Sequence, residues 1–82
     1  MADVKEFDWK ARINIDPGIA AGHPVIKGTR VPVQVIVGAL GGGATIREVC
    51  QDYRVTEEDV RAALVYAADV VARKRARALP RR

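Results

Sequence analysis

The sequence predicts a small, mainly α-helical domain with three helices and a short β element near its N-terminus. A chain of 82 residues has room for one domain, because most domains hold about 100–150 residues. Residues 12–16 alternate between polar and apolar side chains, which is the period of a strand. From residue 33 onward the apolar spacing becomes that of helices, and two segments begin with capping sequences.

Two short extended pieces make up the expected β element. In Arg12-Ile13-Asn14-Ile15-Asp16 the period of two places both isoleucines on one face, and Pro17-Gly18 ends this strand as a turn. Val25-Ile26 forms the second piece. The expected divisions of the chain are an N-terminal arm at 1–12, a helical domain at 13–72 and a basic tail at 73–82.

The first helix is expected to begin near Pro32, since proline fits the first helical turn, where its missing N–H costs no hydrogen bond. Helical spacing then relates four apolar residues, Val33, Ile36, Val37 and Leu40. The glycines 41–43 end the helix, because glycine readily adopts the left-handed conformation of a C-cap.

Capping sequences mark the starts of the other two helices. Thr45-Ile46-Arg47-Glu48 fits a capping box, and the helix that it begins runs to about Tyr53. Its predicted buried side holds Ile46, Val49, Cys50 and Tyr53. Thr56 begins the third helix, with acids in the positive first turn, and this helix continues to about Arg77. Its predicted core stripe holds Val60, Ala63, Leu64, Ala67 and Val71.

The third helix is more apolar than a monomer needs. Ten of the twelve residues from 61 to 72 are apolar, and a helix that is hydrophobic on most sides is usually buried on most sides. We therefore expect a homo-oligomer, most simply a homodimer. The candidate interface residues are Phe7, Trp9, Val65, Tyr66, Ala68, Val70 and Ala72. The alternative is that the arm, through Phe7 and Trp9, covers this helix within one chain.

The positive charge lies in the tail. Residues 1–72 hold eight Lys/Arg and ten Asp/Glu, a net charge of −2, whereas residues 73–82 hold six Lys/Arg and no acid. Such a tail attracts a polyanion or an acidic pocket on another protein, and the alternative is a solvated terminus. The candidate residues for binding a polyanion or an acidic partner protein are Arg73, Lys74, Arg75, Arg77, Arg81 and Arg82.

Catalysis is not expected. The chain has no serine and a single histidine, His23, and Cys50 is interpreted as a small core residue. The acids 57–59 are consecutive, so they point around the helix and do not converge on a metal or a proton. The sequence therefore predicts no cofactor, metal or small-molecule substrate. We expect a cytoplasmic protein, since no apolar run is long enough for a membrane span or a signal peptide.

DNA binding is a second possibility that the residues favour less. Residues 45–53, a short connection and the helix from Thr56 have helix-turn-helix proportions, but the first turn of the second helix is acidic and opposes phosphate contact. The candidate DNA-binding residues are Lys27, Arg30, Arg54 and Arg61. For the loop 27–30 the alternative is a structural turn, in which Gly28 bends the chain and Thr29 or Arg30 bonds backbone carbonyls.

The segment Gly22-His23-Pro24-Val25-Ile26-Lys27-Gly28-Thr29-Arg30-Val31-Pro32-Val33 is long and unusual. Together with residues 13–17, 41–43, 45–49 and 53–67, it resembles a bacterial family called domain of unknown function 433, whose members are often described as VapB-type antitoxins. The resemblance covers residues 13–67, and Lys27 and Arg30 carry over as signature residues without a defined role.

The resemblance implies a winged-helix-like domain, a neighbouring gene for a PIN-like ribonuclease toxin and repression of its own promoter. A PIN-like nuclease holds metal with clustered carboxylates, and such a pocket would attract a guanidinium from the basic tail. The leading interpretation is a non-enzymatic antitoxin-like module that neutralises this toxin by protein contact. The alternatives are a homo-oligomeric interaction module without toxin or DNA partner, and a stand-alone DNA-binding regulator.

Overall fold

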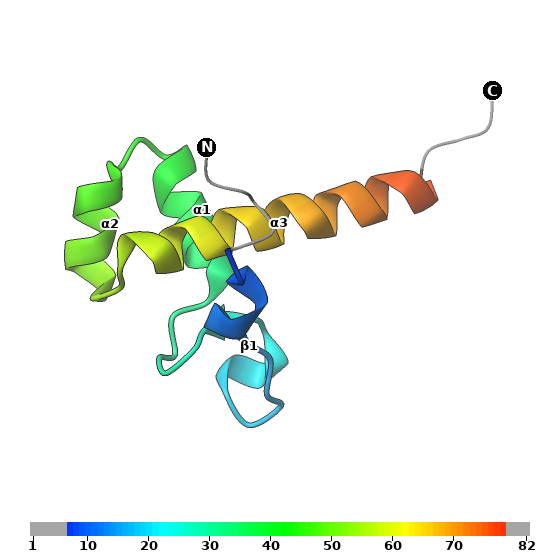
Figure 1. The fold of residues 1–82 in the computed structure, drawn as a ribbon, viewed down its shortest axis with the longest axis horizontal. Helices are drawn as coiled ribbons and strands as arrows, with labels where there is room; N and C mark the ends of the chain where they lie inside the picture. The colour runs from blue at the N-terminus through cyan, green and yellow to red at the C-terminus, as the bar shows by residue number, and fades with distance from the viewer. Residues whose placement is uncertain (1–6, 79–82) are drawn as a thin grey trace.

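A computed structural model describes residues 7–78, with side chains described as far as Lys74 (Figure 1). Three α-helices follow a small β element, as the sequence predicts. In chain order the elements are η2 (Trp9–Arg12), β1 (Ile13–Asn14), η3 (Ala20–Gly22), β2 (Val25–Ile26), α1 (Val33–Gly41), α2 (Ile46–Tyr53) and α3 (Glu57–Ala78). Within this described part, no helix is long and apolar enough to cross a membrane.

The β element is a two-stranded antiparallel sheet that pairs Ile13 with Ile26 and Asn14 with Val25. Both extended pieces were predicted, but the first is shorter than its sequence pattern. The strand ends at Asn14, and the Asp16 side chain accepts a hydrogen bond from the Gly18 N–H at 2.8 Å to form the turn. Ile15 therefore does not share the buried side of Ile13 and is 59% exposed.

The helix ends match the predicted caps closely. Thr45 and Glu48 form the complete capping box, with the Glu48 N–H donating to Thr45 at 3.0 Å and the Thr45 N–H donating to Glu48 at 2.8 Å. Arg54, in the left-handed conformation at φ 57°, ends α2. Thr56 caps α3, because its hydroxyl accepts from the Asp59 N–H at 3.0 Å. The second and third helices therefore begin where the sequence predicts.

The core lies where β2 and the three helices meet. It contains the buried residues Ile26, Val33, Ile36, Val49, Val55, Val60 and Ala63, with Cys50, Tyr53 and Tyr66 among the half-buried residues packed against them. Ala62 is also fully buried. The body of the domain packs mainly against the N-terminal half of α3, and Figure 1 shows the C-terminal half extending beyond the other elements.

Three residues predicted to face the core do not. Ile46 is 45% exposed, Leu64 41% and Val71 63%. Because the buried face of α3 is centred on Ala62 and Ala63, Leu64 falls at its edge. Val71 lies in the half of the helix that extends past the body. Ile46 is the first residue of α2, directly after the N-cap Thr45, at the exposed start of the helix.

Candidate protein-binding site

The N-terminal arm packs on α3 of its own chain. The Arg61 guanidinium lies over the Phe7 ring, 4.2 Å from its centroid, and the Trp9 and Tyr66 rings are 5.9 Å apart with a tilt of 59°. Phe7 and Trp9, two of the proposed interface residues, thus pack on Arg61 and Tyr66 of the same chain, as the alternative to an oligomer predicts. The arm covers one flank of α3.

A second flank of α3 forms an apolar groove with α1. The groove has a volume of about 530 Å³. Its ten lining residues are His23, Pro24, Val33, Gln34, Val37, Gly38, Tyr66, Ala67, Val70 and Val71. None of these side chains carries a fixed charge, so the groove suits apolar side chains of another molecule.

The basic end of α3 lies directly after this groove. Arg73 pairs with Asp69 one turn earlier at 3.0 Å, and Lys74 is exposed. The side chains of Arg75 and Arg77, and all of Arg81 and Arg82, lie outside the described part of the chain. A molecule seated in the groove would therefore meet positive charge at one end of it.

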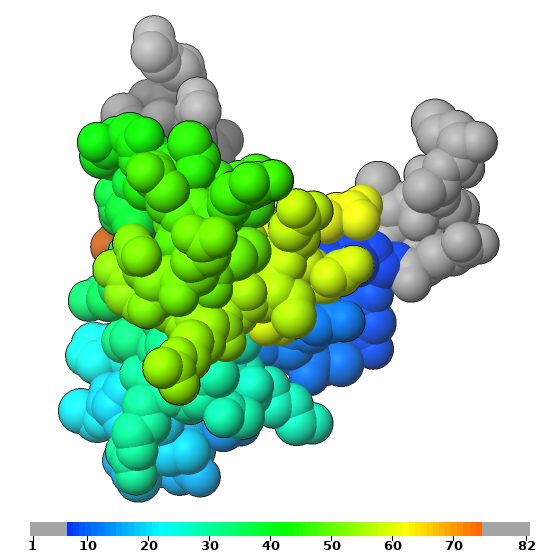
Figure 2. All heavy atoms as spheres, turned by 90° about the vertical axis from the view of Figure 1, so that its left-hand side faces the viewer, coloured from blue at the N-terminus to red at the C-terminus, as the bar shows by residue number. Residues whose placement is uncertain are grey.

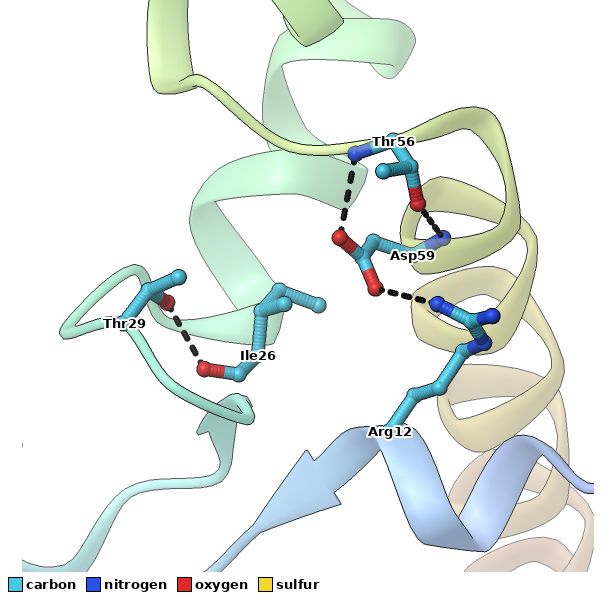
Figure 3. A network of polar contacts seen from close by, with 5 residues as sticks. All are labelled: Arg12, Ile26, Thr29, Thr56 and Asp59. Carbon is cyan, nitrogen blue, oxygen red and sulfur yellow. Dashed lines mark hydrogen bonds and ion pairs between the residues drawn. The ribbon is translucent and has the colours of Figure 1, made fainter.

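The loop 27–30 is a structural turn, which was the alternative to a DNA contact (Figure 3). The Thr29 hydroxyl donates to the Ile26 carbonyl at 2.7 Å and accepts from the Val31 N–H at 3.0 Å, while Gly28 has φ 82°. Lys27 and Arg30 are exposed on this turn. Thr29 and Gly28 fix the backbone that carries Lys27 and Arg30. Folding therefore explains why Gly28 and Thr29 are part of the sequence signature.

The four proposed DNA contacts belong to three separate elements. Lys27 and Arg30 lie on the turn after β2, Arg54 ends α2, and Arg61 lies in α3 over the Phe7 ring. Lys27 also borders a hollow of about 570 Å³ that is lined by the acids Asp8, Glu58 and Asp59. The acids next to Lys27 weaken its attraction for phosphate.

One residue of this hollow was missed by the sequence analysis. Arg12 donates to Asp59 at 3.0 Å and joins η2 to the start of α3, while the Thr56 N–H donates to the other Asp59 oxygen at 3.0 Å (Figure 3). An ion pair across 47 residues leaves no local pattern in the sequence. Asp59 is therefore held as a cap and an ion-pair partner, and Glu57 and Glu58 are the exposed acids of this turn.

The possible catalytic residues are not assembled into a site. Cys50 packs against the core, and partial burial raises the pKa of its thiol, an effect to which the carboxylates of Glu57, Asp59 and Glu58 add. A raised pKa keeps the thiol protonated and weakly nucleophilic at neutral pH. His23 lines the groove instead. Among residues 7–78 no group of His, Cys, Asp and Glu is arranged to hold a metal ion.

The groove itself was not predicted, although the spacing that builds it is visible in the sequence. Val33 and Val37 are four residues apart in α1, and Tyr66 and Val70 are four apart in α3. The sequence analysis assigned the first pair to the core and the second pair to an oligomer interface. Their meeting depends on how α1 packs against α3, which periodicity alone does not give.

Comparisons with known proteins agree with this fold. A sequence model of the family described as “Protein of unknown function (DUF433)” matches residues 13–67. The chain is 41% identical over 54 residues to a Mycobacterium tuberculosis protein named “Putative antitoxin VapB45”, a match that covers 66% of this chain and 23% of that protein.

Two crystal structures are similar to the chain. A DUF433 member protein from Anabaena variabilis matches with a TM-score of 0.67 and 36% identity, covering 71% of this chain and 58% of that one. Rv2018 from Mycobacterium tuberculosis matches with a TM-score of 0.62 and 36% identity, covering 74% of this chain and 28% of that one. The chain thus spans less than two thirds of the length of each of these relatives.

Proposed function

The chain belongs to the DUF433 family of proteins of unknown function, and from this membership we propose that it is an antitoxin-type binding module. It neutralises a PIN-like ribonuclease toxin by protein contact and has no catalytic activity of its own. The name of the relative VapB45 supports the toxin–antitoxin role. Because the substrate of such a toxin is RNA, the proposed place of action is the cytoplasm.

The observation that carries the proposal is the groove between α1 and α3. Val37, Val70 and Val71 present apolar surface on two helices that the core already fixes. Partner helices commonly bind in such grooves through a row of apolar side chains. The groove lining holds no carboxylate, lysine or arginine, and it offers the apolar contact area that protein recognition uses.

The tail supports the same partner by its charge. Arg73 and Lys74 follow the groove, and four more arginines follow them in the sequence. A nuclease that holds metal with carboxylates offers an acidic pocket, and arginine binds carboxylates with two parallel hydrogen bonds. We propose that the groove provides affinity and that the tail reaches the acidic pocket and blocks it.

The test uses the PIN-like nuclease encoded beside this gene, purified and mixed with the full chain. Binding by calorimetry and RNA cleavage are measured for the wild type, for Val37→Asp, for Val70→Asp and for a chain that ends at Ala72. Ile15→Asp is the matched control, because Ile15 is exposed and lies outside the groove.

We expect each groove variant to weaken binding by at least about tenfold, since one charge placed in an apolar contact costs more than about 1.4 kcal/mol. The truncated chain should bind but inhibit poorly. Full inhibition by both groove variants would refute the groove, and full inhibition by the truncated chain would refute the role of the tail. The absence of a PIN-like reading frame beside the gene would favour the alternative, a homo-oligomeric interaction module without toxin or DNA partner.

Promoter binding is a second proposed activity, supported by the exposed Lys27 and Arg30 on their fixed turn. Its test is the salt dependence of binding to the promoter fragment. Double replacement of these two residues by alanine should lower the slope of log affinity against log salt by about 2, since each phosphate contact contributes about one unit. An unchanged slope would remove the turn from the DNA-binding surface.

A further inference from the structure

We propose that the exposed face of α3, together with Ile46 of α2, binds a second copy of this chain in antiparallel orientation. This inference does not depend on a toxin or on DNA. It places the dimer interface on a different face from the one that the sequence predicted through Phe7 and Trp9, which the arm covers within the chain.

The first argument is the position of the exposed apolar residues. Four large hydrophobic residues are exposed in the described part of the chain, and three of them, Ile46, Leu64 and Val71, belong to this surface. Leu64 and Val71 are seven residues apart, and the exposed Ala68 lies between them, so all three share one side of α3. An apolar row of this spacing is the kind of surface that packs against another helix.

The second argument is a hollow at the N-terminal end of this face. It has a volume of about 270 Å³ and lies between the start of α2 and the first turns of α3. Ile46, Val60 and Leu64 form its apolar part, and its border holds the acids Glu57 and Glu58 together with Arg61, whose guanidinium lies over the Phe7 ring. Figure 2 views this end of the molecule, with α2 in green beside the first turns of α3 in yellow.

The third argument is that α3 carries opposite charge at its two ends. Glu57 and Glu58 begin the helix, whereas Arg73, Lys74, Arg75 and Arg77 occupy its last turns in the sequence. A parallel partner helix would bring like charges together, and an antiparallel partner brings each basic end to the acidic end of the other copy. The apolar row is then covered at the same time.

A single two-fold axis brings the acidic end of each α3 to the basic end of the other copy. Residue 66 lies midway between Glu57 and Arg75, so an axis at this level sets the acidic turn of each copy beside the basic turns of the other. Val71, in the C-terminal half of α3, then lies opposite the first turns of α3 in the second copy, beside the hollow. The interface is self-complementary, as a symmetric dimer requires. The groove between α1 and α3 lies on the neighbouring flank of the helix and shares Val71 with this face.

The test is sedimentation equilibrium of the purified full chain without toxin or DNA. The variants are Leu64→Asp, the acidic-end reversal Glu57→Lys/Glu58→Lys, the basic-end reversal Lys74→Glu/Arg75→Glu, and all four reversals combined. Ile15→Asp is again the matched control, since Ile15 is the exposed large hydrophobic residue that does not belong to this face. Circular dichroism verifies that each variant is folded.

We expect a dimer that weakens with salt, and a monomer for Leu64→Asp. Each charge reversal alone should raise the dissociation constant by about tenfold or more, because it replaces attraction by repulsion at both ends. The combined variant should recover most of the lost affinity, since the two ends are complementary again. That recovery separates pairing between copies from an effect on the helix dipole, which the combined variant would not restore.

Three results would overturn the inference. They are a wild-type chain that stays monomeric at concentrations of about 1 mM, a dimer that persists in Leu64→Asp, and a combined variant that dimerises no better than the single-end reversals. Because no toxin is present, none of these results bears on the proposed antitoxin function.

Discussion

Asp59 makes one of the most informative tests of the fold, because a single carboxylate joins the start of α3 to the N-terminal arm. One oxygen accepts from the Thr56 N–H and the other from Arg12, each at 3.0 Å, and the Asp59 N–H donates to the Thr56 hydroxyl. Replacing Asp59 by alanine removes the hydrogen bond from the Thr56 N–H and the ion pair together, whereas the Thr56 hydroxyl can still cap the helix. We expect the free energy of unfolding to fall.

The size of the effect follows from the contacts. Loss of the hydrogen bond between the Thr56 N–H and the Asp59 carboxylate costs about 1 kcal/mol. The ion pair adds about 0.5 kcal/mol, because the Arg12 side chain is 40% exposed and solvent screens the pair, although Asp59 is only 16% exposed. Loss of the negative charge at the helix N-terminus adds about 0.5 kcal/mol. The sum of about 2 kcal/mol should lower the melting temperature by about 8–16 °C for a domain of this size.

The assay is urea unfolding followed by circular dichroism. Glu58→Ala is the control, since Glu58 is an exposed acid in the same turn, and it should change stability by about 0.5 kcal/mol or less. Asp59→Asn should have an intermediate effect. Its amide oxygen can still accept the hydrogen bond from the Thr56 N–H, but the ion pair with Arg12 is lost. In a double-mutant cycle with Arg12→Ala, the coupling energy should be about 0.5 kcal/mol. If Asp59→Ala destabilises no more than Glu58→Ala, the reasoning from these three contacts is wrong.

Other substitutions test the core, the turn and the thiol. Ile36→Ala, at a fully buried position, should cost about 2–5 kcal/mol by urea unfolding, and a cost under 1 kcal/mol would contradict the packing. Gly28→Ala should cost about 1–2 kcal/mol although its added methyl meets open space, because φ is 82°. Gly38→Ala, in the helix and also facing open space, should stabilise by about 0.5–1 kcal/mol, and a loss of stability in the same assay would refute this. Alkylation of Cys50 by iodoacetamide should be slower in the folded chain than in urea at the same pH, since burial and nearby carboxylates raise the pKa of the thiol and lower its thiolate fraction. Its rate should rise at a higher pH than in the unfolded chain, and equal pH profiles would contradict the raised pKa.

The sequence was most informative where a structure depends on neighbouring residues. The capping box of Thr45 and Glu48, the start of α3 after Thr56 and the turn built by Gly28 and Thr29 all involve residues within four positions of each other. The partners of these hydrogen bonds are close in the sequence, so local patterns are enough to predict them. The family resemblance was also confirmed, since the family model matches residues 13–67.

Long-range contacts were predicted less well. Helical periodicity assigned Leu64 and Val71 to the core, but both are exposed, because periodicity does not show where the core ends. The ion pair of Arg12 with Asp59 and the groove between α1 and α3 join segments far apart in the chain. The position of the arm was left open between two alternatives, since Phe7 and Trp9 could pack on either copy.

The small size of the domain explains why α3 has more apolar surface than its own core can bury. A chain of this length hides about 60% of its unfolded surface, so its stability of roughly 4–12 kcal/mol has little reserve. A ligand present at 100 times its dissociation constant adds about 2.7 kcal/mol. Occupation of the groove by a partner, or of the neighbouring face of α3 by a second copy, would therefore change the stability by as much as a core substitution does. The proposed binding of either partner is therefore coupled to folding, because both processes bury apolar faces of α3.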